Sequence, residues 1–178
     1  MKDLLIEKIS QALRESSNVL GSCERNTEIK IAYLALWALG WDPVADIGLG
    51  FQIPAAKIGP KAGGSNAPDF VVRDGAKIFM VGEAKYWAID EHEPKKWKGG
   101  QDKLSTYLHA LPAPRGFLTC GKTWIITDQR GQEITTIRAT NDGRKLIDQL
   151  QRHIGKGSIS DGYYSPKAWD YGICPSSQ

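Results

Sequence analysis

The sequence predicts an α/β (α+β) fold with a mixed central β-sheet flanked by helices. Its 178 residues suit one domain that buries a sizeable core without disulfides or a structural metal. Apolar residues make up 41% and charged residues 24%, which is typical of a globular protein. Helix and strand patterns follow in the order α, α, β, β, β, α, β, β, β, α, and this order favours a mixed sheet. We expect one domain over residues 1–178, with a core of about 26–153 and a C-terminal tail over 154–178.

Two helices are predicted before the first strand. Apolar residues recur at every fourth position from about Asp3 to Ser16, which is typical of an amphipathic helix. The segment from Glu28 to Leu39 is apolar on most sides, follows a capping residue at Asn26 or Thr27, and stops at Gly40. We expect this second helix to lie in the core.

Strands and helices then alternate through the rest of the chain. Residues 44–54 form a strand candidate broken by glycines, and a loop rich in glycine and proline follows over 57–68. Two further strands joined by a turn are predicted over 68–87. The remaining predicted elements are a helix over 101–111, three short strands over 115–120, 123–128 and 133–139, and a last helix over 142–153.

The predicted hairpin carries Asp69, Glu83 and Lys85, and its register decides whether they meet. A two-residue turn places Asp69 opposite Met80 and away from Glu83. A three-residue loop over 74–76 places Asp69 opposite Val81, diagonal to Glu83 and on the same face. We favour the second register because it leaves one face free of charge, with Phe70, Val72, Ile78, Met80, Gly82 and Ala84 on it and Asp69, Arg73, Lys77, Glu83 and Lys85 opposite.

These residue types suit phosphodiester chemistry. Two carboxylates on one side of a sheet, roughly 7 to 8 Å apart at the backbone, can close on one hard cation through oxygen ligands. Mg²⁺ usually binds one or two carboxylates together with substrate phosphate oxygens, and the Lys85 ammonium can orient a water or neutralise charge on the phosphate. In a second interpretation, Glu83 and Lys85 form a cross-strand ion pair on a solvated face.

The chain resembles the PD-(D/E)xK nuclease superfamily. Its motif is present as Pro68-Asp69, thirteen residues, then Glu83-Ala84-Lys85. The chain is also similar to the nuclease domain of type I restriction enzyme motor (R) subunits. That similarity covers roughly residues 26–128, with Glu28 leading a helix that ends in LGW and GFLTCGKTWIITD following the hairpin.

The resemblance implies a restriction-endonuclease-like fold and a metal-dependent deoxyribonuclease that hydrolyses DNA phosphodiester bonds. Asp69 and Glu83 would be metal ligands together with the Ala84 carbonyl, Lys85 would be catalytic, and Glu28 would lie near the metal. The cofactor would be Mg²⁺, with Mn²⁺ as a substitute. Relatives often carry a Gln and a Tyr four residues apart on the following helix, whereas Gln101 and Tyr107 are six apart here.

Further residues are candidates for nucleic-acid binding. Lysines with an interleaved aromatic residue can hold phosphates and stack on a base, although such charged segments are also common as solvated loops. The candidates are Lys57, Lys61, Lys95, Lys96, Trp97, Lys98 and Gln101. The expected partner is DNA, together with a possible homodimer or a separate motor or specificity subunit. The alternatives are a catalytically weak nucleic-acid-binding or partner-binding module of the same fold, and a subunit active only with such a partner.

Composition excludes other classes of protein. The net charge of +3 does not by itself indicate a nucleic-acid partner. Three cysteines without CxxC pairing suggest neither a disulfide framework nor a zinc site. Asp3 and Glu7 interrupt the first apolar stretch, which argues against a signal peptide, and the longest apolar run is too short for a membrane span. We expect a cytoplasmic protein with no membrane partner.

Overall fold

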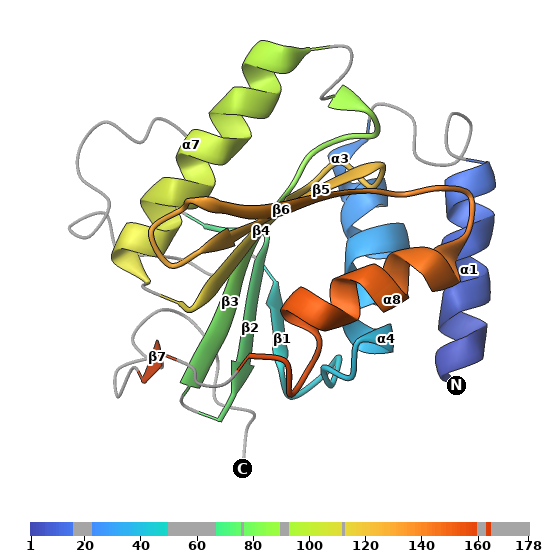
Figure 1. The fold of residues 1–178 in the computed structure, drawn as a ribbon, viewed down its shortest axis with the longest axis horizontal. Helices are drawn as coiled ribbons and strands as arrows, with labels where there is room; N and C mark the ends of the chain where they lie inside the picture. Colours follow the sequence, from blue (N-terminus) through green and yellow to red (C-terminus); the bar gives the residue numbers. More distant parts are fainter. Residues whose placement is uncertain are drawn as a thin grey trace.

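A mixed sheet runs through the centre of the protein (Figure 1). The structure, a computed structural model, describes residues 1–15, 23–49, 67–75, 77–89, 93–111, 113–159 and 163–164. Seven strands lie within these ranges: β1 (Ile47–Leu49), β2 (Phe70–Asp74), β3 (Lys77–Ala84), β4 (Arg115–Thr119), β5 (Thr123–Asp128), β6 (Glu133–Arg138) and β7 (Tyr163–Tyr164). The order is β1-β2-β3-β4-β5-β6, and β7 pairs with the start of β3. The β3–β4 pair is parallel and the other pairs are antiparallel.

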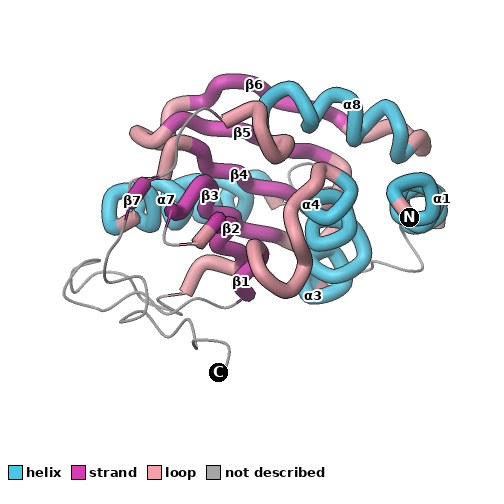
Figure 2. The backbone as a smooth tube through the Cα atoms, turned by 90° about the horizontal axis from the view of Figure 1, so that it is seen from below, coloured by secondary structure: helices cyan, strands magenta, loops and turns pink. Residues whose placement is uncertain are grey.

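Helices cover both faces of this sheet. One face is covered by α1 (Lys2–Arg14), by α8 (Gly143–Ile154) and by the consecutive α3 (Glu24–Thr27), η1 (Glu28–Tyr33) and α4 (Leu34–Ala38). The other face is covered by α7 (Pro94–Ala110). Figure 2 shows α1, α4 and α8 gathered at one side and α7 at the other. The predicted α/β fold with a mixed sheet flanked by helices is confirmed.

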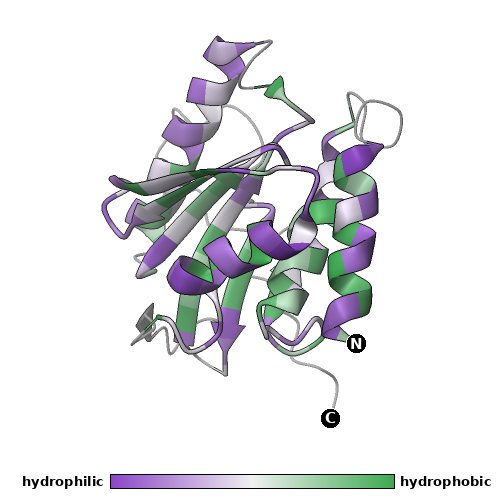
Figure 3. Ribbon diagram, turned by 45° about the vertical axis from the view of Figure 1, so that its right-hand side comes forward, coloured by the Kyte–Doolittle hydropathy of each residue, from purple (hydrophilic) through white to green (hydrophobic). Residues whose placement is uncertain are grey.

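Two apolar cores lie on the two faces of the sheet. Phe70, Phe117 and Trp124 belong to the core beneath α1, α4 and α8, whereas Val71 and Val81 belong to the core beneath α7. Figure 3 shows the apolar residues concentrated along the strands, with polar residues on the outer side of α8. No helix in the described ranges is long and apolar enough to cross a membrane.

The second helical segment begins earlier than the sequence predicts. It starts at Glu24, so Asn26 and Thr27 lie inside the helix, and the prediction that either residue caps it is wrong. The N-cap is Cys23, and Glu24 in the first turn interacts favourably with the helix dipole. The middle part is a π-helix, a geometry often found at functional sites. Because of the earlier start, a second acidic side chain, Glu24, lies on the helix one turn before Glu28.

The hairpin contains a bulge that neither considered register includes. Val71 pairs with Val81, but Arg73 pairs with Ile78 and not with Lys77, because the register shifts between residues 72 and 73. The predicted register is therefore wrong in detail, and Ile78 lies in the core beneath α7 instead of on the predicted charge-free face. The extra residue, at position 79, packs against the opposite core. The bulge shifts the pairing of β2 with β3 by one residue. Beyond it, the side chains of Asp69 and Glu83 lie on the same face of the sheet and meet.

The helix after the hairpin also begins earlier than expected. The charged stretch expected to be a linker is helical from Pro94, seven residues before Gln101. Proline is well suited to this position because the first helical residue needs no N–H donor. The candidates Lys95, Lys96, Trp97 and Lys98 therefore lie on the first turns of α7. Its buried face is formed by Gly100, Leu104, Tyr107, Leu108 and Ala110.

The later strands and the last helix lie where the sequence predicts them, and the last helix has a side-chain cap. Asp142 accepts hydrogen bonds from the backbone N–H groups of Arg144 and Lys145, at 2.9 and 3.2 Å. We expect Asp142→Ala to lower the free energy of unfolding by about 1 kcal/mol, because these donors lose their partner. Urea denaturation checks this, with Asp142→Asn as the control that keeps an acceptor. Equal losses in both variants would contradict the capping role.

Candidate metal centre

Three carboxylates from three separate elements converge at the end of β3. Glu24 lies on α3, Asp69 immediately precedes β2, and Glu83 lies at the end of β3. One carboxylate oxygen from each residue lies within 4.8 Å of the other two. Lys85 follows β3 and lies among them. The sequence predicted that Asp69, Glu83 and Lys85 would meet, and the structure brings these three side chains together.

Glu83 is the most deeply buried of the three acids, with 2% of its side chain exposed. Its Oε1 accepts a hydrogen bond from Lys85 Nζ at 2.6 Å and lies 3.5 Å from Lys103 Nζ. Its Oε2 is buried and has no hydrogen-bond partner among the described residues. A buried carboxylate oxygen without a donor is costly unless a cation or water satisfies it. The interpretation of Glu83 as part of a solvated surface ion pair is therefore wrong.

Lys85 is held by three oxygen acceptors. Its Nζ donates to Glu24 Oε1 at 2.5 Å, to Glu83 Oε1 at 2.6 Å and to the Ala84 carbonyl at 2.9 Å. Burial disfavours the charged ammonium, but the negative charges of Glu83 and Glu24 outweigh it, so the pKa of Lys85 is raised above its usual value. Lys85 therefore stays positively charged at neutral pH.

Asp69 is in an environment that disfavours its negative charge. Burial contributes most and the charge of Glu83 adds to it, so the pKa of Asp69 rises from 3.8 to about 7. The Ala84 N–H, which donates to Asp69 Oδ2 at 2.7 Å, and the Lys85 charge partly oppose this shift. Divalent cations favour an ionised carboxylate, so a cation here would stabilise the charged form of Asp69.

Glu28 lies close to this group but outside it. Its side chain is largely buried, and its Oε2 accepts from Arg25 at 2.5 Å. Its negative charge contributes to the raised pKa of Asp69, which places it near the site. The third member of the carboxylate group, however, is Glu24. Sequence reasoning missed Glu24 because the helix was predicted to begin at Glu28, which left Glu24 in the preceding loop.

Two residues of α7 that the sequence did not single out as site residues face the carboxylates. Lys103 contacts Glu83, and burial, with smaller contributions from the charges of Glu83 and Asp69, raises the pKa of Tyr107. The Tyr107 hydroxyl donates to the Ala67 carbonyl at 3.2 Å, two residues before Asp69. Lys103 precedes Tyr107 by four residues, so the two residues share one face of α7.

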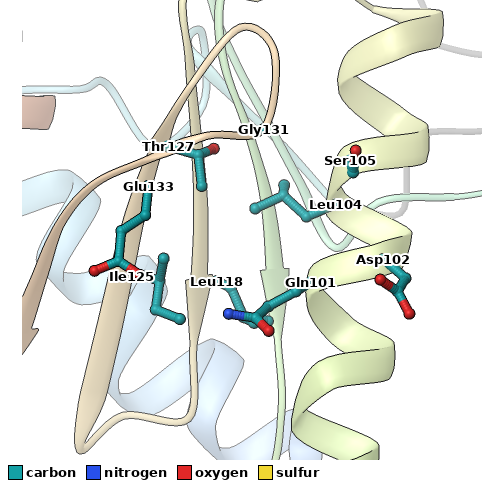
Figure 4. Close-up of a pocket in the computed structure, with 9 residues that line it drawn as sticks. All are labelled: Gln101, Asp102, Leu104, Ser105, Leu118, Ile125, Thr127, Gly131 and Glu133. Carbon is teal, nitrogen blue, oxygen red and sulfur yellow. The ribbon is translucent and has the colours of Figure 1, made fainter.

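Gln101 itself faces a different cavity. Figure 4 shows it between α7 and the strands, lining a cavity of about 290 Å³ with Leu118 from β4 and Thr127 from β5. Two residues apart on a helix do not share a face, so Gln101 and Lys103 point to different surroundings. The structure does not bring Gln101 to the carboxylate group.

The other residues predicted to bind nucleic acid lie at different places relative to the carboxylate group. Lys96 lines a cavity of about 360 Å³ beside the carboxylate group, together with Glu24, Lys85 and Lys103. Lys95 and Lys98 are exposed elsewhere on α7, and Trp97 packs partly buried against the core beneath α7. Lys57 and Lys61 lie outside the described residues.

Comparisons with known proteins give one weak structural similarity. No known protein family matches the sequence, and no curated protein matches it. A cryo-EM structure of a DrdV–DNA complex is similar with a TM-score of 0.46 and 18% sequence identity. The similarity covers 83% of this chain and 13% of the DrdV chain, so this chain spans a small part of that protein.

Proposed function

We propose that this protein is a Mg²⁺-dependent endonuclease that hydrolyses DNA phosphodiester bonds. One observation carries the proposal: three carboxylates converge beside a charged lysine, and the buried Glu83 Oε2 has no donor among the described residues. Carboxylate oxygens are the ligands that Mg²⁺ prefers, and a cation contact would satisfy the uncompensated oxygen. The resemblance to PD-(D/E)xK nucleases agrees with this chemistry.

The metal would be held by Asp69 and Glu83, with Glu24 as a third carboxylate and the Ala84 carbonyl as a further oxygen. The backbone of Ala84 is fixed on both sides, because its N–H donates to Asp69 and its carbonyl accepts from Lys85. Tyr107 holds the chain two residues before Asp69 and thereby positions that carboxylate. Bound Mg²⁺ supplies a Lewis acid for the phosphoryl oxygen and a water of lowered pKa.

Lys85 would be the catalytic residue that faces the reacting phosphate. Its ammonium lies at the edge of the cavity that Lys96 and Lys103 also line. With Glu24 and Glu83 committed to holding a cation, the Lys85 ammonium would be available to contact a phosphate oxygen or to orient the attacking water. This role needs the proton on Lys85, which its raised pKa secures at neutral pH.

The test is a cleavage assay combined with metal titration. Purified protein is incubated with supercoiled, linear, single-stranded and branched DNA in Mg²⁺, Mn²⁺, Ca²⁺ or EDTA, and Mn²⁺ binding is measured by calorimetry. We expect nicking in Mg²⁺ and Mn²⁺ and none in EDTA, with Mn²⁺ binding in the absence of DNA. A protein that binds DNA but neither binds Mn²⁺ nor cleaves would be the binding module instead.

A further inference from the structure

One face of α7 forms a track that carries two lysines beside the carboxylate group. Lys96, Gly99, Gly100 and Lys103 recur at the three- and four-residue spacing of one helix face, and all four line the cavity that contains Lys85. The two lysines are accessible, with 64% and 44% of their side chains exposed. Their ammonium groups pair with the acids on either side, Glu93 at 2.6 Å and Glu83 at 3.5 Å.

The two glycines at the middle of this face, Gly99 and Gly100, have different explanations. At Gly100 a Cβ would lie 3.0 Å from Leu118 Cδ1 and 3.3 Å from Lys85 Cε, so close packing favours glycine there. At Gly99 a Cβ would meet no described atom within 4 Å. Glycine inside a helix is less stable than alanine, so packing does not account for Gly99. A bare backbone that lines a cavity is typical of a place where a ligand approaches closely.

We propose that the α7 face formed by Lys96, Gly99 and Lys103 seats the phosphodiester backbone of one nucleic-acid strand beside the carboxylates. This inference rests on the proposed function and extends it by naming the surface that the strand follows. Two ammonium groups flanking a bare stretch of helix match a chain of phosphates. Lys96 and Lys103 are about 10 Å apart along the helix axis, which is about three nucleotides of one strand.

Lys103 links this surface to the metal centre. In the protein alone it lies against Glu83, and a divalent cation on Glu83 would compete with the lysine for the same carboxylate. The displaced ammonium then faces the phosphate track. Metal binding and strand binding therefore favour each other, and by linkage each raises the affinity for the other by the same factor.

Four variants test the track, using DNA binding in Ca²⁺ and Mn²⁺ calorimetry without DNA. Gly99→Ala should raise the unfolding temperature while weakening DNA binding, and Gly99→Leu should weaken it at least about tenfold. Lys103→Ala should bind Mn²⁺ more tightly than wild type, bind DNA more weakly and lower the salt slope of DNA binding by about one. Lys145→Ala, on α8 at the opposite face of the sheet, should leave both affinities unchanged.

The outcomes separate this inference from the proposed function. If wild type cleaves DNA but Gly99→Leu and Lys103→Ala bind DNA as wild type does, the track is wrong and the endonuclease proposal stands. In a second outcome, wild type neither binds Mn²⁺ nor cleaves DNA, while the Gly99 and Lys103 variants lose DNA binding. That result supports the track as a DNA-binding surface and overturns the endonuclease proposal. Absence of DNA binding by wild type would overturn both.

Discussion

Glu83→Gln is expected to abolish DNA cleavage and to weaken Mn²⁺ binding more than the roughly 10- to 100-fold typical of losing an outer-shell partner. The substitution removes the charge of the most buried carboxylate and places an amide N–H₂ donor where a cation requires an oxygen. It leaves Asp69, Glu24 and Lys85 in place. Mn²⁺ calorimetry and a nicking assay on the same preparation measure the two effects.

Lys85→Ala should impair DNA cleavage without impairing Mn²⁺ binding. The carboxylates remain, and the loss of a positive charge 2.6 Å from Glu83 Oε1 makes the site more attractive to a cation, so Mn²⁺ affinity should stay equal or rise. Cleavage should fall by roughly 10² to 10³, the range typical of removing one electrostatic stabiliser. Loss of Mn²⁺ binding in Lys85→Ala, or wild-type cleavage by it, would contradict the assigned role. Lys145→Ala controls for the loss of one positive charge.

The meeting of Asp69 and Glu83 was predictable, whereas the register that produces it was not. Side chains alternate along strands, so an apolar pattern decides which residues share a face. At the bulge, however, both Ile78 and Phe79 are apolar, and each can pack against a core. The sequence pattern therefore does not show which residue is the inserted one. The prediction survived at the site because the extra residue lies between the turn and the site, where it shifts the pairing by one residue and places Asp69 on the same face as Glu83.

Glu24 was missed because it lies before the predicted start of its helix, and Lys103 because the local sequence does not show which face of its helix meets Glu83. The polar residues and the glycine pair before Gln101 favour a loop when they are considered locally. For this reason the first turns of α7 were not predicted as helix. Packing of Leu104 and Tyr107 against the sheet outweighs that local preference. The docking of α7 on the sheet decides that Lys103 faces Glu83 and Gln101 faces the other cavity. Residue spacing could identify the hairpin acids but not the partners supplied by distant helices.

Asp69→Asn is expected to stabilise the metal-free protein at alkaline pH. The folded state holds the Asp69 pKa at about 7 against 3.8 for an ordinary Asp, because burial and Glu83 disfavour its charge. The sign follows from linkage: the folded state binds the proton more tightly, so this contribution is fully present below pH 3.8 and is lost as pH rises to about 7. Asparagine cannot ionise, and its Oδ1 can still accept from the Ala84 N–H.

Urea denaturation in EDTA at pH 5 and pH 8 measures this effect. At pH 8 Asp69→Asn should exceed wild type in free energy of unfolding by about 1 to 4 kcal/mol, and the advantage should shrink at pH 5. Asp148→Asn, exposed on α8, controls for the loss of one negative charge. A variant that is no more stable than wild type at pH 8 would show that Asp69 carries no such penalty in the folded state.

Addition of Mn²⁺ should reverse the order of stability at pH 8. A cation that binds only the folded state stabilises it by mass action, and wild type supplies the ionised Asp69 that the cation needs. Mn²⁺ affinity of wild type should therefore rise with pH up to about 7 and level off above it, as Asp69 loses its proton. Asp69→Asn should gain little stability from Mn²⁺ at any pH. Both the reversed order of stability and the pH dependence of Mn²⁺ affinity are expected if the carboxylates repel one another without metal and a bound cation stabilises them. Neither result is expected if Asp69 has a purely structural role.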